Sequence, residues 1–152
     1  MSIYNSYKGK RILVTGHTGF KGTWLVAILH NLGAKILGFA LVPETDNCIY
    51  NEIDGDNLCK SVIGDIRDKA KLEKIIIEFQ PDFIFHLAAQ ALVIKSYAIP
   101  SETFEINVVG TANLLEAVNL LNKKCVIVAI TTDKVYENNE SDIPYQEKDR
   151  LG

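Results

Sequence analysis

Short apolar runs and longer stretches of mixed polarity alternate along the 152 residues of the chain. Each apolar run is only four to seven residues long, as expected for a strand buried on both faces. The stretches between them repeat their apolar positions at helical spacing. The pattern predicts strands at 11–15, 35–41, 61–64, 82–87 and 126–130, and helices at about 21–31, 68–79 and 103–121.

Start and stop signals support the predicted helices. Gly33 stands where the C-cap of the first helix belongs, Asp68 is placed to cap the second, and Pro81 follows its end. Segments 42–57 and 137–152 are polar and are expected to be loops, the first with at most one short helical turn. The inner face of the third helix is expected to carry Phe104, Val108, Leu115 and Val118.

The turn between the first strand and the first helix is rich in glycine and reads GHTGFKG at 16–22. Gly16 would allow a sharp turn, Gly19 would let the backbone approach an anion, and Gly22 would allow close packing of helix and strand. The N–H groups at the start of the helix would then face the anion. We therefore predict a pyrophosphate-binding site of the dinucleotide type, with an ordinary glycine-rich turn as the alternative.

The alternation of strands and helices indicates right-handed crossovers and a parallel sheet. Combined with a glycine turn after the first strand, it predicts a doubly wound α/β domain of the Rossmann type over residues 1–152, with strand order 3-2-1-4-5. A ligand is expected beyond the carboxyl ends of the strands, where the order switches between strands one and four. No internal repeat or linker divides the sequence.

Small and polar residues follow other strands at this same edge. Ala88 and Ala89, within HLAAQ at 86–90, would let a ribose or nicotinamide lie against the backbone, and Asp65 could accept a hydrogen bond from an adenine amino group. The run TTDK at 131–134 ends the fifth strand. Each has a plainer alternative: core packing for HLAAQ, a loop or N-cap carboxylate for Asp65, and a turn with a solvated ion pair for TTDK.

Composition narrows the function classes. The net charge of −3 and the pI near 5.6 give no electrostatic footprint for nucleic acid. No secretory signal or membrane-spanning stretch is present, so no membrane partner is expected. Three widely spaced cysteines indicate free thiols and a cytoplasmic location: Cys48, Cys59 and Cys125. The three histidines stand too far apart to predict a metal site: His17, His30 and His86.

At this point the sequence resembles the extended short-chain dehydrogenase/reductase family over nearly its whole length. The resemblance rests on VTGHTGFKG at 14–22, GDIRD at 64–68, HLAAQ at 86–90 and NVVGTANLLEA at 107–117. Three further features are similar to the CDP-glucose 4,6-dehydratase subfamily. They are the Thr-Trp-Leu after the glycine loop, the pattern from His86 to Phe104, and TTDKVYEN at 131–138.

The resemblance implies a bound NAD and a nucleotide-sugar substrate. NADP stays open, because segment 38–41 offers neither the acidic residue that binds the ribose hydroxyls of NAD nor an arginine for a 2′-phosphate. The implied cofactor-binding residues are Gly16, Thr18, Gly19, Phe20, Lys21, Gly22, Asp65, Ile66, Leu87, Ala88, Ala89, Gln90 and Asn107.

The implied reaction is an internal redox elimination. Hydride leaves C4 of the hexose, water is lost across C5–C6, and hydride returns to C6. By similarity, Thr132 would bind the C4 oxygen, Asp133 would be the acid for the departing hydroxyl, and Lys134 would take the position of the C5 base. A lysine base must be neutral, which requires burial or a nearby cation.

One family feature is missing from these residues. The catalytic Tyr-x-x-x-Lys expected after strand five is not present, since Tyr136 and Tyr145 are followed four residues later by Glu140 and Asp149. The pair Tyr4 and Lys8 has the spacing but precedes the first strand. We therefore expect an N-terminal part of a longer dehydratase, with the sugar-binding part absent.

Two alternatives remain open at the level of sequence. One is another extended family member, such as a UDP-sugar 4-epimerase or a UDP-N-acetylglucosamine dehydratase. The other is a non-catalytic dinucleotide-binding module, which is the better description of these 152 residues taken alone. The resemblance also implies a homodimer, with helix 103–121 as the candidate surface, and an uncovered apolar face is expected near strand five.

Overall fold

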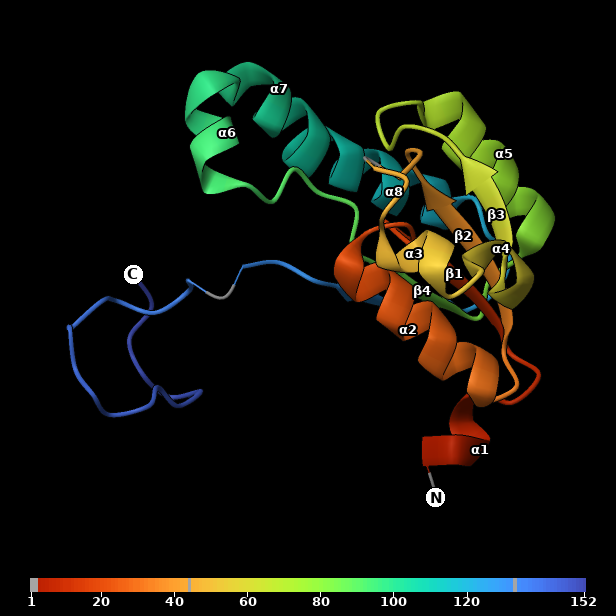
Figure 1. Cartoon of the computed structure of the whole chain (residues 1–152), viewed down its shortest axis with the longest axis horizontal. Helices are drawn as coiled ribbons and strands as arrows, with labels where there is room; N and C mark the ends of the chain where they lie inside the picture. The colour runs from red at the N-terminus through yellow and green to blue at the C-terminus, as the bar shows by residue number, and fades with distance from the viewer. Residues whose placement is uncertain (1–2, 44, 133) are drawn as a thin grey trace.

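The computed structural model describes residues 3–43, 45–132 and 134–152 of the chain (Figure 1). It contains five strands and a set of helices that alternate with them. The strands are β1 (Arg11–Thr15), β2 (Lys35–Ala40), β3 (Lys60–Ile63), β4 (Phe83–His86) and β5 (Val126–Ala129). The helices are α1 (Ile3–Tyr7), α2 (Phe20–Asn31), α3 (Ile49–Glu52), α4 (Gly55–Leu58), α5 (Lys69–Phe79), α6 (Val93–Ala98), α7 (Pro100–Phe104), the π-helical turn η1 (Glu105–Val109) and α8 (Gly110–Asn119).

The five strands form one parallel sheet in the order β3-β2-β1-β4-β5. This confirms the predicted doubly wound fold and its strand order. Strand β1 lies at the centre, with Val14 opposite Gly38 of β2 and Phe85 of β4. The carboxyl end of β1 therefore lies beside those of β2 and β4, which fixes where the glycine turn must sit.

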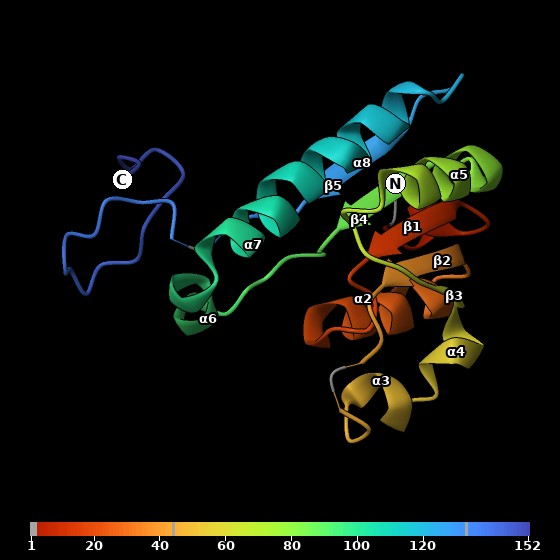
Figure 2. The same ribbon diagram turned by 90° about the horizontal axis from the view of Figure 1, so that it is seen from above.

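Helices cover the sheet on two faces (Figure 2). On one face α5 packs against α8, and Leu72, Ile76 and Leu114 close a core cluster over Leu13 and Ile84. On the other face α2 packs over a second cluster. Its buried members are Ile12, Val14, Val26, Leu29, Ile36 and Cys59. Because alternate residues of β1 point into both clusters, this central strand is almost fully buried.

Local signals in the sequence explain where the helices begin and end. The Asp68 side chain accepts a hydrogen bond from the Lys71 N–H at 3.1 Å, which confirms it as the cap of α5. Gly33 has a φ of +75° just after α2, a conformation that glycine adopts without steric cost. Both positions confirm the predicted boundaries.

Three features differ from the sequence-based expectation. Segment 42–57 was expected to be a loop, but it forms α3 and most of α4, and residues 93–98 add α6. The long helix begins at Pro100 and is interrupted by the π-helical turn η1, which shifts the helical phase. The assignment of its inner face was partly wrong, because the buried stripe runs through Gly110, Leu114 and Ala117 instead. Phe104, Val108 and Leu115 are 66%, 56% and 45% exposed, whereas Val118 packs against the core.

Strand β5 is covered on one face only. Ile127 packs against the core cluster beneath α8, while Val126 and Val128 on the opposite face are 52% and 43% exposed. This confirms the expected uncovered apolar face near strand five. Beyond it, the described residues from Lys134 onward lead away from the sheet, where Tyr136 pairs with Leu151 and stacks on Tyr145 (Figure 1).

Candidate functional site

The glycine turn is built directly against the end of β4. Gly16 has a φ of +73°, and a Cβ there would lie 2.8 Å from the backbone N of Ala88. A Cβ on Gly22 would lie only 2.0 Å from the Gly16 carbonyl oxygen. The turn can therefore reach this position only because both residues lack side chains. The predicted sharp turn is confirmed at Gly16, and Gly22 packs closely against the turn itself.

The same turn leaves hydrogen-bond donors free at the start of α2. Gly19 is the N-cap, its φ of −77° is ordinary, and no side chain caps this helix end. The first N–H groups of an α-helix have no partner within the helix, so those of the first turn are available to an external acceptor. A Cβ on Gly19 would meet only the Gly16 carbonyl oxygen, at 3.4 Å, so its outer side is open. Such a cradle suits a pyrophosphate.

A chain of hydrogen bonds fixes the carboxyl ends of β1 and β4. Thr111 donates to the Asn107 carbonyl at 2.7 Å, so its oxygen accepts from His86 Nε2 at 2.9 Å. His86 Nδ1 must then accept from the Thr15 hydroxyl at 2.7 Å, which defines a neutral imidazole. Burial lowers the pKa of His86, in agreement with this assignment.

The Thr15 hydroxyl also accepts hydrogen bonds from the chain that leaves β4. The N–H groups of Leu87 and Ala88 reach it at 3.1 and 3.2 Å. Three successive residues at the end of β4 thus meet one buried hydroxyl of β1, and two of them, Leu87 and Ala88, are predicted cofactor residues. The backbone of HLAAQ is therefore fixed at the carboxyl ends of β1 and β4, and its contact with a cofactor stays a prediction.

Asn107 holds the next part of this segment. Its Oδ1 accepts from the Gln90 N–H at 2.8 Å, and its Nδ2 donates to the Gln90 carbonyl at 3.1 Å. The side chain comes from η1, so the clamp joins the long helix to the loop that leaves β4. Two predicted cofactor residues are thus brought into contact with each other.

Replacing Asn107 with alanine is expected to lower the free energy of unfolding by about 2 kcal/mol, because two backbone groups of Gln90 lose their partners in a half-buried place. Urea denaturation followed by circular dichroism measures the change. The exposed Asn119, at the end of α8, provides the control, and its alanine variant should unfold within about 0.5 kcal/mol of the parent chain. Equal losses in the two variants would contradict the clamp.

Asp65 follows β3 and is already engaged by Arg67. The guanidinium approaches both carboxylate oxygens, with the closest contact at 2.6 Å, and the Arg67 N–H donates to Oδ1 at 2.8 Å. Hydrogen bonding to Arg67 holds the pKa of this carboxyl below its ordinary value. Arg67 also reaches Glu102 of α7 at 3.4 Å. Asp65 therefore organises its own loop, and the predicted bond to adenine stays a prediction.

The predicted catalytic residues follow β5 at the same edge of the sheet. Thr132 Oγ1 accepts a hydrogen bond from the Lys134 N–H at 3.1 Å, and both residues are exposed. Asp133 lies outside the described residues. The Lys134 side chain is thus open to water, and its role as a base stays a prediction.

The remaining predicted cofactor residues border the glycine turn or β3. The Thr18 hydroxyl donates to the Leu41 carbonyl at 3.0 Å, which ties the turn to the end of β2. Phe20, Lys21 and Ala89 are exposed, whereas Ile66 is buried beneath Gly110 of α8.

Within the described ranges, no group of three or more His, Cys, Asp or Glu side chains could hold a metal ion. None of the described helices is long and apolar enough to span a membrane.

Comparison with known proteins identifies the family. Residues 13–152 match the family described as GDP-mannose 4,6 dehydratase. The chain belongs to this family. This match confirms the resemblance to the extended short-chain dehydrogenase/reductases that was seen in the sequence.

Individual relatives agree with the family assignment. CDP-glucose 4,6-dehydratase of Salmonella typhimurium is 45% identical over 148 residues, which cover 97% of this chain and 41% of that protein. CDP-paratose 2-epimerase of Salmonella typhi is 38% identical over 86% of this chain and 39% of its own length. The chain therefore spans about two fifths of the curated relatives that it matches.

Solved structures of related enzymes share the fold. UDP-glucose-4-epimerase from Stenotrophomonas maltophila, with bound NAD, superposes over 94% of this chain and 43% of its own with a TM-score of 0.79 and 25% identity. UDP-glucose 4-epimerase from Bifidobacterium longum, in complex with NAD+ and UDP, gives a TM-score of 0.80 and 27% identity over 93% of this chain and 42% of its own.

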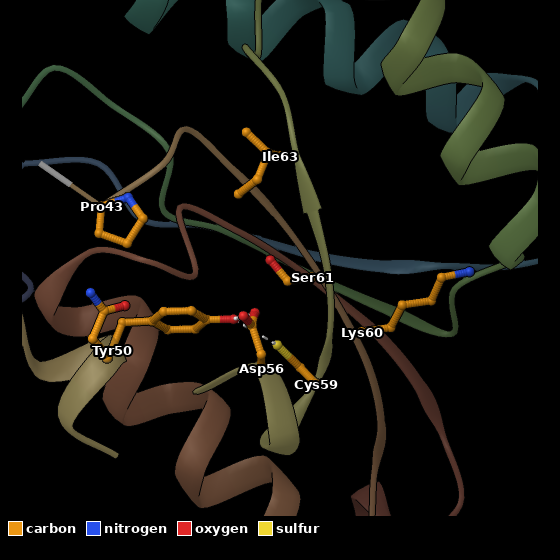
Figure 3. Close-up of a pocket in the computed structure, with 8 residues that line it drawn as sticks. Pro43, Tyr50, Asp56, Cys59, Lys60, Ser61 and Ile63 are labelled. Atoms are coloured by element: carbon orange, nitrogen blue, oxygen red, sulfur yellow. Dashed lines mark hydrogen bonds between the residues drawn. The ribbon is translucent and has the colours of Figure 1, made fainter. Parts of the chain in front are cut away.

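Sequence reasoning missed one part of this dehydratase-family domain. A cavity of about 430 Å³ lies beside β3, α3 and α4 (Figure 3). Its lining consists of Pro43, Tyr50, Asn51, Asp56, Cys59, Lys60, Ser61 and Ile63. The neighbouring strand β2 carries one visible signal, which marks close packing rather than the cavity itself. Gly38 lies inside a strand, and glycine there often marks the close approach of another group.

Proposed function

We propose that this chain binds NAD across the carboxyl edge of its sheet, with the pyrophosphate on the glycine turn and the start of α2. The observation that carries the proposal is the close fit of Gly16 and Gly22 against backbone atoms, next to a helix start that no side chain caps. The solved relatives with bound NAD support this choice of cofactor. NADP is the alternative that a direct titration separates.

We further propose that the protein is a sugar-nucleotide 4,6-dehydratase that acts on CDP-glucose, with this chain as its cofactor-binding half. The identity of 45% to the CDP-glucose enzyme, against 30% to a GDP-mannose 4,6-dehydratase of Vibrio cholerae, supports the choice of substrate. When bound, NAD would accept the hydride from C4 and return it to C6. The chain's own residues would orient the sugar and move protons.

Three residues after β5 are assigned roles in that chemistry. We assign the Thr132 hydroxyl to the C4 oxygen, Asp133 to protonation of the departing hydroxyl and Lys134 to the position of the C5 base. Their place after β5, at the edge that carries the glycine turn, supports this assignment. For Lys134 to act as a base it must become less exposed than it is here, because burial favours the neutral amine.

Two other functions are separated by their products. A UDP-sugar 4-epimerase, as in several structural relatives, would keep the C6 oxygen, whereas a dehydratase removes it. A module that only binds the dinucleotide would turn over neither sugar. For the 152 residues alone we expect this last behaviour, since they hold no Tyr-x-x-x-Lys after β5.

The decisive experiment is a chimera. Residues 1–152 replace the matching part of the Salmonella typhimurium CDP-glucose 4,6-dehydratase, and the products from CDP-glucose are identified by NMR. We expect the 4-keto-6-deoxy sugar nucleotide from the chimera and none from the 152-residue chain. A chimera that retains NAD but forms no such product would contradict the proposed catalytic roles, and turnover by the isolated chain would contradict its assignment as a half.

The remaining proposals concern the surroundings of the enzyme. We propose a nucleotide-sugar substrate, no nucleic-acid or membrane partner, a cytoplasmic location and a homodimer. The exposed apolar side chains of α7, η1 and α8 support the dimer surface. Sedimentation of the chimera and of its Leu115→Glu variant tests it, since a charge in the interface should shift the equilibrium to monomers.

A further inference from the structure

His17 belongs to the glycine turn, yet its side chain leads away from the crevice. The ring is fully buried and crosses β2 at Gly38, where a Cβ would lie 2.3 Å from the ring. Beyond β2, its Nε2 forms a hydrogen bond with the Ser61 hydroxyl of β3 at 2.8 Å. One side chain thus connects the turn after β1 with the edge strand, over a neighbour that has no side chain of its own.

A second aromatic ring packs against the His17 ring. Tyr50 of α3 meets it edge to face, with ring centroids 5.3 Å apart and an interplanar angle of 83°. The Tyr50 hydroxyl donates to Asp56 Oδ1 at 2.8 Å, and its ring occupies the space left by Gly55 of α4 (Figure 3). Two glycines thus make room for two rings, and the rings join the turn to the wall of the 430 Å³ cavity.

The residue after His17 adds a second contact between the glycine turn and the sheet. Thr18 donates to the Leu41 carbonyl at the end of β2, at 3.0 Å. The Thr23 hydroxyl of α2 donates to the His17 carbonyl at 3.2 Å, which fixes the backbone between the turn and the helix. Successive residues of the turn are therefore attached to β2, β3 and α2. The end of β2 is where the adenosine ribose lies in dinucleotide folds.

We propose that His17 is a positioning residue: it holds the glycine turn in its pyrophosphate-binding conformation by linking it to Ser61 and Tyr50. This rests on the proposed binding of NAD. The His17 side chain points to Ser61 and Tyr50, so its effect is to pre-organise the backbone that would contact the phosphates. The ring must be neutral to stay buried. Burial lowers the pKa of His17 to about 4, against opposing effects of the Phe39 carbonyl and the Asp56 carboxylate.

Variants that separate ring packing from hydrogen bonding test the proposal. His17→Phe keeps a ring but loses the bond to Ser61, whereas His17→Gln can keep the bond through its amide. We expect His17→Phe to weaken NAD and ADP binding about tenfold, because one hydrogen bond that holds the turn is lost. His17→Gln should restore most of the affinity. AMP, which has no pyrophosphate, should bind the parent chain and His17→Phe alike. His30→Gln, at an exposed histidine of α2, is the matched control.

A second measurement does not depend on NAD. Amide hydrogen exchange of the free chain should be faster over residues 16–23 in His17→Phe than in the parent chain, with exchange in α5 and α8 unchanged. Unchanged exchange over 16–23, or NAD affinity equal to the parent in folded His17→Phe, would overturn the positioning role. If the parent chain itself fails to bind NAD while the exchange result holds, the proposed function fails and the role of His17 in the turn stands.

Discussion

Replacing Gly22 with alanine is expected to lower the free energy of unfolding by about 3 kcal/mol and to abolish NAD binding. The new Cβ would lie 2.0 Å from the Gly16 carbonyl oxygen and 2.8 Å from the Cα of His17, and both are backbone atoms that cannot rotate away. The turn or the start of α2 must shift to admit it. Urea denaturation and calorimetric titration measure the two effects.

Gly19 supplies the matched control for this prediction. Its φ of −77° suits any residue, and an added Cβ would approach only the Gly16 carbonyl, at 3.4 Å. Gly19→Ala should therefore unfold within about 1 kcal/mol of the parent chain. If Gly22→Ala were as stable as Gly19→Ala, the close packing of α2 on the turn would not be what shapes this site.

Stability is expected to fall in mild acid, by on the order of 3 kcal/mol between pH 6.5 and pH 4 from His17 alone. Burial lowers its pKa to about 4 from the ordinary value of 6.5, so the unfolded chain takes up this proton first as the pH falls. The stabilisation is complete above pH 6.5 and is lost as the pH approaches 4. His86, whose pKa burial also lowers, acts in the same direction.

Unfolding in urea at pH 7, 6, 5 and 4.5 checks the acid prediction. The carboxylates of Asp65 and Asp82 have lowered pKa values through Arg67 and Lys123, so their contribution to stability begins to fall only at about pH 5 and is lost mainly below pH 3.8, which leaves most of this window to the histidines. His17→Gln should flatten the curve. A parent chain equally stable at pH 7 and pH 5 would show that the two buried histidines are not held neutral.

The sheet and its order could be predicted because both depend on short-range signals and on chirality. Apolar runs such as 11–15 mark buried strands, and right-handed crossovers with a glycine turn leave one arrangement of the first strands. The capping side chain of Asp68 and the left-handed Gly33 are local as well. These features do not depend on which residues meet across the fold.

What could not be predicted depends on contacts between distant segments. His17 meets Ser61 across 44 residues, and Thr15 meets His86 across 71, so no local pattern reveals either bond. The inner face of the long helix was misassigned because apolar side chains stand on two of its faces, and only packing against distant segments decides which face is buried. Leu114 and Ala117 are covered, while Leu115 is exposed. Gly38 alone carried a visible signal, as a glycine inside an otherwise apolar strand.

The most direct test of the account is a calorimetric titration of the 152-residue chain with NAD and, separately, with NADP. We expect saturable binding of NAD, weaker binding of NADP, and at least a tenfold loss of NAD affinity in a folded Gly19→Val variant, whose side chain would occupy the open side of the turn. A folded chain that binds neither dinucleotide, or that binds NAD equally well as Gly19→Val, would contradict a pyrophosphate site on the glycine turn.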